Sequence, residues 1–213
     1  MSLSTSSTND IIINIDKTSI SLHNHIEIKN HLNNITIVGS SKEKSIIKFD
    51  DISMGFTFYN NVKKIKITNL TIYGYIHFEG VNEIEFENVV FYGTLEANNG
   101  KNEYNDNLKL TNIIFYGMTS LKNKKACMDL SVDTEINNSY FYGSSSFTES
   151  IIYFNGDDKF FIYITDSYFD GAYSIRCLDL QHVKTCNIKG STFEKGSCLT
   201  GNDGGYINIF NNE

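Results

Sequence analysis

The segment TNIIFYG, residues 111–117, recurs with small changes along much of the chain. Its relatives are TNLTIYG ending at Gly74, ENVVFYG at Gly93, NNSYFYG at Gly143 and TDSYFDG at Gly171. The Asn or Asp at the second position recurs after intervals that range from 19 residues, between Asn69 and Asn88, to 28. Repeats of this length are typical of solenoids.

The residues on both sides of this reference position alternate between apolar and polar. The second and fourth residues before it are apolar almost throughout: Ile67 and Ile65, Phe86 and Ile84, Leu110 and Leu108, Ile136 and Thr134, Ile164 and Ile162, Ile188 and Cys186, Ile209 and Ile207. A second apolar column follows it: Ile72, Phe91, Phe115, Phe141, Phe169 and Phe193. A period of two indicates half-buried strands and not helices. We include Asn34 as the first reference position and Asn211 as the last.

A third strand is predicted in some repeats, at 127–130, 151–154 and 176–180. Three short strands per repeat, stacked in parallel, form a β-helix. Asn suits the turn between the first two strands, because it tolerates the left-handed conformation and its amide can pair with the amide above. We therefore expect an all-β fold, a parallel β-helix of about seven to eight coils.

One domain is expected over residues 11–213, after a flexible N-terminal tail at residues 1–10. The tail is predicted because MSLSTSSTND is polar. At the other end, INIFNNE restarts the strand pattern and stops inside a coil. We expect either a fragment of a longer solenoid or a natural end that another segment covers.

The repeats IKITNLTIYG, IEFENVVFYG, LKLTNIIFYG and IYITDSYFDG resemble those of the right-handed parallel β-helices of the pectin-lyase-like superfamily. The resemblance extends over roughly residues 11–213 and implies a right-handed helix. It says little about activity, because this architecture supports enzymes, adhesins and repeat scaffolds alike.

The net charge of −7, from 18 basic and 25 acidic residues, argues against nucleic acid as a partner. Binding of phosphates requires a basic surface. No stretch approaches the roughly 20 apolar residues of a membrane span, so no membrane insertion is expected. The five His residues and four Cys residues show no metal-ligand spacing, and we expect no metal and no cofactor.

Polygalacturonase-like enzymes of the superfamily that the repeats resemble carry Gly-Asp-Asp and Gly-His-Gly motifs on successive coils, and the chain contains a partial match. Asp157 and Asp158 follow Gly156, one coil after Asp133 and one coil before His182. However, His182 lacks flanking glycines, and the only arginine precedes it in place of following it. We expect the two Asp residues to be turn residues and the protein not to be an enzyme. The alternative is a polysaccharide lyase or glycoside hydrolase that uses Asp157, Asp158 and His182.

Two cysteines, Cys177 and Cys198, each lie 13 residues before a reference position and are predicted to stack in adjacent coils. Parallel side-chain vectors disfavour a disulfide between them, so buried free thiols are expected. Cys186 is predicted to lie in the core. His23 and His25 are predicted to be surface or cap residues.

Outward positions after the reference Asn form an aromatic and aliphatic flank. One column contains Tyr73, Tyr92, Tyr116 and Tyr142, followed by Asp170 and Glu194; the other contains Val90, Ile114, Tyr140 and Tyr168. An exposed patch of this kind usually marks a partner surface, and tyrosine is favoured at interfaces. The alternative is that the tyrosines stabilise neighbouring coils or lie under a loop.

Outward positions before the reference Asn are charged, with signs that alternate from coil to coil: Lys66, Glu85, Lys109 and Glu135. Opposite charges on adjacent strands help to set the register and keep this flank soluble. We interpret it as scaffold and expect function on the tyrosine flank.

The sequence therefore predicts a non-catalytic binding or scaffolding module of a secreted or cell-surface protein. Its candidate binding residues are Tyr73, Tyr92, Tyr116, Tyr142, Tyr140 and Tyr168, and its partner is a protein or a polysaccharide. The Asn/Ile/Lys-rich coils resemble repeats of anaerobic-fungal cellulosome scaffoldins, which implies a cohesin that recognises dockerin-bearing enzymes. They also resemble repeats of surface adhesins.

Overall fold

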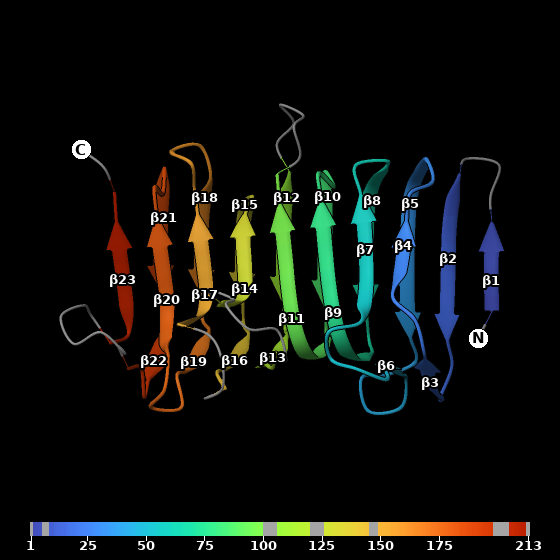
Figure 1. The fold of residues 1–213 in the computed structure, drawn as a ribbon, viewed down its shortest axis with the longest axis horizontal. Coiled ribbons are helices and arrows are strands. Elements are labelled where there is room, and N and C mark those ends of the chain that lie inside the picture. The colour runs from blue at the N-terminus through green and yellow to red at the C-terminus, as the bar shows by residue number, and fades with distance from the viewer. Residues whose placement is uncertain are drawn as a thin grey trace.

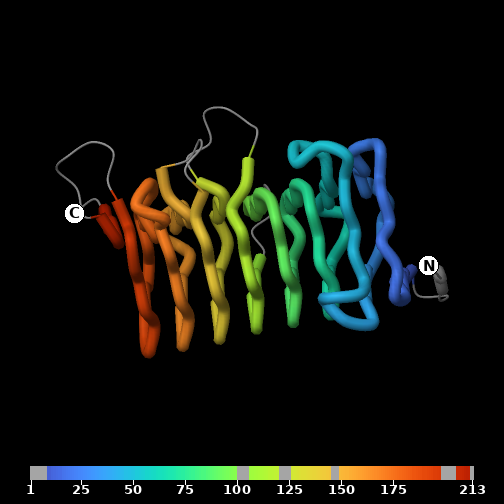
Figure 2. Tube along the Cα trace, turned by 90° about the horizontal axis from the view of Figure 1, so that it is seen from below, coloured from blue at the N-terminus to red at the C-terminus, as the bar shows by residue number. Residues whose placement is uncertain are grey.

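β-Strands account for all the regular secondary structure in the part of the chain that the computed structural model describes, residues 2–5, 9–99, 106–119, 126–144, 149–197 and 205–211. The strands lie side by side in one long stack, with the first strands at one end and the last at the other (Figures 1 and 2). The predicted all-β class is confirmed.

One sheet, which we call the first face, contains the strands that precede the reference Asn. Its strands, in spatial order, are β1 (Ser2–Thr5), β2 (Asp10–Ile15), β5 (Leu32–Gly39), β8 (Val62–Thr68), β10 (Glu83–Glu87), β12 (Asn107–Thr111), β15 (Asp133–Asn137), β18 (Phe161–Thr165) and β21 (Thr185–Lys189). From β2 onward every pair of neighbours is parallel and in register, so equivalent residues of successive repeats lie over one another.

A second sheet is curled and supplies two further faces. The second face contains β3 (Ser19–Leu22), β6 (Ile46–Phe49), β13 (Ile114–Gly117), β16 (Tyr140–Tyr142), β19 (Tyr168–Asp170) and β22 (Thr192–Glu194). The third face contains β4 (Ile26–Ile28), β7 (Gly55–Tyr59), β14 (Ala126–Ser131), β17 (Ser150–Asn155), β20 (Arg176–Gln181) and β23 (Ile207–Phe210). β14, β17 and β20 confirm the predicted third strands.

Two long strands, β9 (Thr71–Glu79) and β11 (Val90–Asn98), join the second face to the third. The first half of β9 pairs with β6 and its second half pairs with β7, while β11 divides in the same way between β13 and β14. Both strands curve where they pass from one face to the next (Figure 1). The curl of the second sheet therefore lies within continuous strands.

Glycine is required at this bend because the backbones of successive layers approach each other closely. Gly74 and Gly93 have φ of 149° and 151°, a conformation that residues with a Cβ rarely adopt. A Cβ on Gly93 would lie 1.7 Å from the carbonyl oxygen of Gly74. The glycine that ends each repeat is thus an architectural residue.

The core consists of columns of like side chains. Ile65, Ile84, Leu108 and Ile162 lie in one first-face column with Thr134, and all are buried. Phe91, Phe115, Phe141 and Phe169 form the matching second-face column and are fully buried. The rings of Phe141 and Phe169 stack at 4.6 Å. Burial of these aromatic side chains in four successive layers is a large apolar contribution to the stability of the stack.

The reference Asn residues adopt the predicted left-handed conformation at the turn between the first and second faces. Asn69, Asn88 and Asn112 have φ between 54° and 57°. The Asn88 amide donates to Asn69 Oδ1 at 2.6 Å, and the Asn112 amide donates to Asn88 Oδ1 at 3.2 Å. The predicted amide ladder is confirmed for these three layers.

The turn also contains a serine column that the sequence analysis did not identify. Ser139, Ser167 and Ser191 occupy the position after the reference residue. The Ser139 hydroxyl accepts from the Ile113 backbone N–H, and the hydroxyls of Ser167 and Ser191 accept from the backbone of the preceding layer in the same way. These hydrogen bonds connect successive layers in the later part of the chain. In the earlier layers the same position holds an apolar residue, Leu70, Val89 or Ile113.

Both end members of the predicted Asn series are wrong. Val38 pairs with Thr68, so Gly39 and not Asn34 corresponds to Asn69; Asn34 lies within β5, opposite Lys64. β23 pairs with β20 on the third face, so Asn211 does not continue the ladder. Its side chain instead hydrogen-bonds to the backbone of Val183. Asn34 thus precedes the apolar alternation of a first-face strand, and Asn211 follows that of a third-face strand.

The N-terminal tail predicted at residues 1–10 contains a strand instead. β1 pairs antiparallel with β2, which itself begins at Asp10. The edge strand of a sheet has unpaired backbone N–H and C=O groups, and at this end of the first face β1 pairs with those of β2.

The cysteine predictions have mixed outcomes. Cys177 is a buried free thiol, as predicted, and Cys127 is buried too, but Cys186 is exposed, because β21 is the last described strand of its sheet and no further described layer covers it. Tyr206 lies beside Cys177, where Cys198 was predicted; its carbonyl accepts from the Cys177 N–H, and Cys198 lies outside the described residues.

Replacing Asn88 with Leu should destabilise the fold by about 1–3 kcal/mol. The substitution removes both ladder bonds and places a bulky side chain in the left-handed region. Urea unfolding monitored by circular dichroism measures the change. The matched control is Asn187→Leu, at an exposed strand position of the first face. Equal stability of the two variants would contradict the ladder.

Candidate functional site

Four tyrosines occupy equivalent outward positions on the second face. Tyr73, Tyr92, Tyr116 and Tyr142 lie in register on β9, β11, β13 and β16. Successive ring centroids are 4.4, 4.6 and 5.0 Å apart, with interplanar angles of 2°, 8° and 14°. We call these four residues the tyrosine ladder. The predicted row, with a spacing close to that of neighbouring strands, is present.

The stacked geometry determines which part of each ring can meet a partner. Each ring covers the face of the next, and all four side chains are half-buried. Solvent therefore reaches ring edges and hydroxyl groups along the ladder. A sugar ring that stacks on an aromatic face would find these faces already occupied.

The other two predicted binding tyrosines belong to the adjacent column and do not extend the ladder. Tyr140 is 47% exposed, and its ring lies 6.1 Å from the tilted ring of Tyr168. The Tyr168 hydroxyl donates to Glu194 at 3.1 Å. Val90 and Ile114 precede Tyr140 in the same column and are half-buried. The ladder and this column together form an apolar strip two residues wide.

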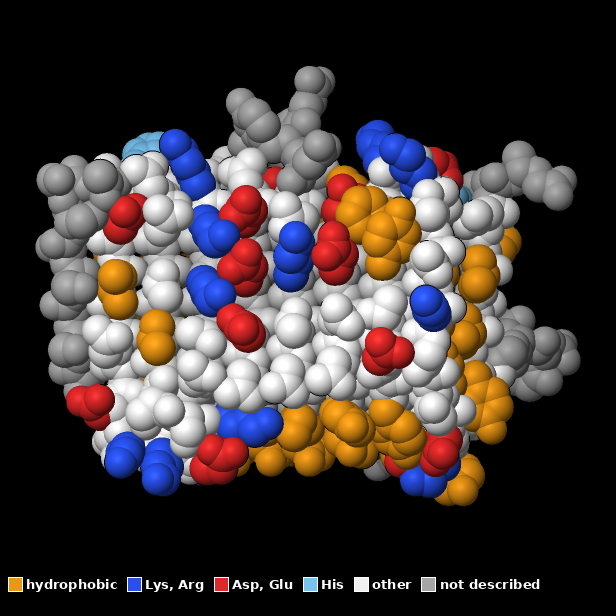
Figure 3. Space-filling model, turned by 180° about the vertical axis from the view of Figure 1, so that it is seen from behind, with side chains coloured by type: hydrophobic (Ala, Val, Ile, Leu, Met, Phe, Trp, Pro, Cys, Tyr) orange, Lys and Arg blue, Asp and Glu red, His pale blue; other side chains and the backbone are white. Residues whose placement is uncertain are grey.

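The ladder has charged residues at both ends. Lys48 pairs in register with Tyr73, and its ammonium lies 6.0 Å from the centre of that ring. At the other end Asp170 and Glu194 continue the column beyond Tyr142. Figure 3 shows the row of hydrophobic side chains along one edge of the molecule, with charged groups at both of its ends.

Lys48 was not recognised in the sequence analysis. The reason is the misplaced first repeat: with Asn34 as reference, IIKF at residues 46–49 is not aligned with TIY. Aligning Gly39 with Asn69 would have placed Lys48 at the start of the tyrosine column.

Burial favours the neutral phenol of two ladder residues, Tyr92 and Tyr142. Partial burial, helped by the neighbouring Tyr73, raises the pKa of Tyr92 above its ordinary value. Burial likewise raises the pKa of Tyr142. Beside them, burial alone would raise the pKa of Asp170, but the hydrogen bond from Lys195 holds it below the ordinary value. The Asp170 carboxylate is therefore already paired, and Glu194 is the exposed acid at this end.

The charged flank of the first face has the alternation that was predicted. Lys66 lies over Glu85, which lies over Lys109 and then Glu135. Lys64 contacts Glu83 at 2.7 Å and Glu85 at 3.1 Å, and Lys66 contacts Glu87 at 2.9 Å. Figure 3 shows these opposite charges interspersed across the face. Exposed pairs of this kind stabilise by no more than about 1 kcal/mol each.

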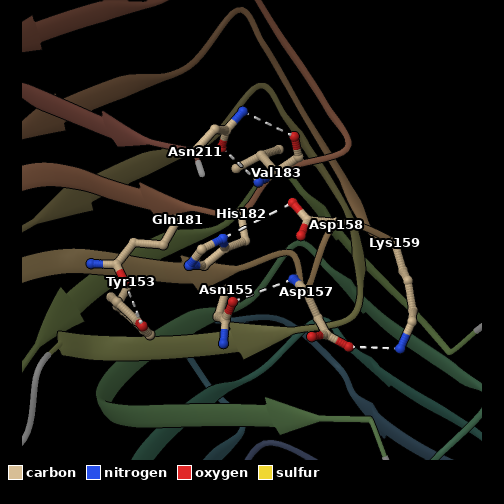
Figure 4. A network of polar contacts seen from close by, with 9 residues as sticks. All are labelled: Tyr153, Asn155, Asp157, Asp158, Lys159, Gln181, His182, Val183 and Asn211. Carbon is tan, nitrogen blue, oxygen red and sulfur yellow. Dashed lines mark hydrogen bonds and ion pairs between the residues drawn. The ribbon is translucent and has the colours of Figure 1, made fainter. Parts of the chain in front are cut away.

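The residues of the alternative catalytic set have structural contacts. Asp157 and Asp158 are turn residues with φ of 47° and 55°, as predicted. Asp157 pairs with Lys159 at 2.7 Å, whereas His182 Nδ1 lies 4.0 Å from Asp158 (Figure 4). Asp133 accepts a hydrogen bond from the Phe161 backbone at 3.0 Å.

Arg176 is also a structural residue of the third face. Its side chain is 9% exposed and lies 3.4 Å from the Asp179 carboxylate, which is likewise buried. Asn208 donates to Asp179 from the next layer at 3.1 Å.

A polar cluster on the outer side of the third face was missed by the sequence analysis. The Tyr75 hydroxyl donates to the buried Glu96 at 2.7 Å, and His77 Nε2 lies 3.5 Å from the Asn98 amide. Burial and the bond to Glu96 raise the pKa of Tyr75 far above its ordinary value. The available signal was the alternation that continues beyond Gly74 and Gly93 into residues 75–79 and 94–98.

An apolar cavity of 380 Å³ lies at the N-terminal end of the core. Its lining includes core residues such as Ile13, Ile20, Leu22 and Phe56, with Glu27 and Lys29 among the polar residues. Several of these side chains are only half-buried, because they belong to the first layer.

In the described part of the chain, no helix has the length and hydropathy to cross a membrane, and no group of three His, Cys, Asp or Glu side chains is arranged to hold a metal ion. Comparison with known proteins found no matching family model, no similar curated protein and no similar solved structure.

Truncating Tyr116 to Ala should destabilise the fold by about 1–3 kcal/mol, because the ring stacks on both neighbours and each aromatic pair contributes about 0.5–1.5 kcal/mol. Tyr116→Phe keeps both stacks and should change stability by less than about 0.5 kcal/mol. Urea unfolding measures both. If Tyr116→Ala unfolds at the same urea concentration as the wild type, stacking between the rings does not stabilise the fold.

Stability should fall as pH rises above about 10, where free tyrosine ionises. Because the folded-state pKa of Tyr92 and Tyr142 is raised, the folded protein retains protons that the unfolded chain has lost. Their contribution is complete below about pH 10 and disappears as pH rises through the folded values. Urea midpoints between pH 8 and 11 measure the slope.

In the double variant Tyr92→Phe/Tyr142→Phe, stability should fall less steeply as pH rises. Part of the fall should remain, because the pKa of Tyr75 is raised as well. A slope identical to that of the wild type would show that folding does not raise the pKa of Tyr92 and Tyr142.

Proposed function

We propose that the stacked layers form a right-handed parallel β-helix of about seven to eight coils that serves as a non-catalytic protein-binding module. Three faces connected by an Asn turn and a Gly bend support the helical path. The right hand is the one that crossover connections between parallel strands almost always take. The repeats' resemblance to the pectin-lyase-like superfamily points the same way.

The observation that carries the binding role is the continuous tyrosine ladder on an outer face. Outward positions of a sheet that faces water are ordinarily polar, as they are on the charged flank of the same molecule. Here four tyrosines and the neighbouring Val90, Ile114 and Tyr140 form an apolar strip. Tyrosine combines a rigid apolar ring with a hydrogen-bonding group, the combination favoured in the anchors of protein interfaces.

A protein partner fits this surface better than a polysaccharide. Polysaccharides dock through sugar rings that stack on exposed aromatic faces, and within the ladder these faces are stacked on each other. A protein surface can pack on ring edges and hydrogen-bond to the row of hydroxyls. Rigid, mutually supported side chains also lose little conformational entropy on binding.

The biological setting belongs to the proposal and rests on composition. The Asn/Ile/Lys-rich coils resemble repeats of scaffoldins and surface adhesins. We therefore assign the module to a secreted or cell-surface protein, in which a cohesin-like role toward dockerin-bearing enzymes is the narrowest form of the idea.

The test compares capture of native secreted proteins by the immobilised wild-type chain and by Tyr116→Ala, followed by calorimetric titration of each captured protein. Loss of a buried aromatic anchor often costs 1–4 kcal/mol, so binding to Tyr116→Ala should weaken about tenfold or more. Lys109→Ala and Glu135→Ala on the charged flank are the controls and should bind as the wild type does. If only the charged-flank variants lose binding, the binding surface is the charged flank and not the tyrosine ladder.

Titration with xylan and polygalacturonate separates the alternatives. We expect no saturable binding and no release of reducing sugars or unsaturated products. Polysaccharide cleavage that disappears in Asp157→Asn would replace the binding module with a carbohydrate-active enzyme. If a polysaccharide binds without being cleaved and this binding depends on Tyr116, the tyrosine ladder is the binding site but its partner is a polysaccharide and not a protein.

A further inference from the structure

We infer that the tyrosine ladder binds a second copy of the same chain, with the two stacks running in opposite directions. This inference rests on the proposed function of the ladder as a protein-binding surface and names its partner. It is drawn from the order of residues along the column that contains the ladder.

That column has seven positions in register: Lys48, Tyr73, Tyr92, Tyr116, Tyr142, Asp170 and Glu194. Tyr116 is at the centre, a lysine is at one end and a glutamate is at the other. A twofold axis through Tyr116, perpendicular to the column, exchanges the two ends. It places Lys48 of each copy opposite Glu194 of the other, which is the self-complementary arrangement that a twofold dimer requires.

The two end groups are available for this contact. Lys48 is exposed and, among the described residues, contacts the Tyr73 ring without forming an ion pair. Glu194 is exposed and accepts a hydrogen bond from the uncharged Tyr168 hydroxyl. Asp170, by contrast, is neutralised by Lys195. Each end therefore presents one charge, and the two charges have opposite signs.

The parallel arrangement of two copies is disfavoured by the same charges. An axis along the stack would bring Lys48 against Lys48 and Glu194 against Glu194. Like charges placed opposite each other in an interface oppose association. The ends of the ladder thus select the antiparallel dimer, and its centre supplies the apolar contact.

The size of the strip indicates a weak dimer. Six strand spacings from Lys48 to Glu194 correspond to about 29 Å, and two side-chain columns are about 14 Å wide, so the strip covers roughly 400 Å². A standard stable interface buries about 800 Å² per partner. Association is therefore expected to depend on concentration and, because charges contribute, on salt.

Sedimentation velocity of the full chain over a wide concentration range tests the inference. We expect a monomer–dimer equilibrium in the wild type that weakens at high salt. Lys48→Glu and Glu194→Lys should each weaken dimerisation at least tenfold, because the twofold axis makes every reversed charge act twice. Lys109→Glu on the charged flank is the matched control and should dimerise as the wild type does.

The double variant Lys48→Glu/Glu194→Lys should restore dimerisation, because each reversed charge then faces its reversed partner. Restoration is the decisive result, since it requires a folded protein and the antiparallel contact together. Failure to restore it, or single reversals without effect, would overturn the inference.

Two further outcomes separate this inference from the proposed function. If the wild type stays monomeric at all concentrations while Tyr116→Ala loses binding to a captured protein, the inference of a dimer is overturned and the proposed protein-binding function remains in place. A dimer that is insensitive to Tyr116→Ala and to the charge reversals lies on another surface and overturns the inference, whereas the proposed function is then decided by whether Tyr116→Ala loses a captured protein.

Discussion

In-register parallel pairing is the constraint on which the whole molecule depends. Each side chain of one layer lies over its equivalent in the next at the spacing of neighbouring strands, from β8 through β18 on the first face and from β9 through β19 on the second. A position can therefore be occupied only by residues that pack well against their own kind or against a complement. Isoleucine and phenylalanine satisfy this inside, Asn pairs its amide at the turn, and Gly permits close backbone approach at the bend. On the outer faces the same constraint selects alternating charges or stacked aromatic rings.

The central layers could be predicted from the sequence because each column repeats a single chemical preference. The apolar alternation, the Asn turn and the row of four tyrosines all follow from aligning the reference residues, and the third strands were recognised in three layers. The ends could not be predicted in this way. Asn34 occupies a different register position of a first-face strand, and Asn211 follows a third-face strand; local alternation does not encode the pairing that sets the register of β5 and β23. The polar cluster around Tyr75 and Glu96 was missed because β9 and β11 continue as strands through the bend at Gly74 and Gly93, whereas the repeated segment ends at these glycines.

The candidate site illustrates how stacking converts a residue preference into a surface. A tyrosine at one outward position contributes little alone, but the same choice in four layers produces a rigid strip with a regular row of hydroxyls. The stacking that rigidifies the strip also occupies the ring faces, so in the proposed binding role stability and recognition depend on the same contacts. The column continues beyond the tyrosines with charged residues, Lys48 at one end and Asp170 at the other. Because these charges have opposite signs, the two ends of the strip differ.

The central claim is that the four tyrosine rings stack on one another in the folded protein. Photo-oxidative dityrosine coupling at a concentration low enough to exclude contact between molecules tests it most directly, because coupling requires adjacent rings. Tryptic mapping with fragmentation of the cross-linked peptides assigns the products, since Lys101 separates Tyr92 from Tyr116 and fragmentation distinguishes Tyr92 from Tyr73 and Tyr75 in the same peptide. The account predicts an intramolecular Tyr92–Tyr116 cross-link as a major product. Coupling confined to more exposed residues such as Tyr173 and Tyr206, which are 76% and 50% exposed, would contradict it.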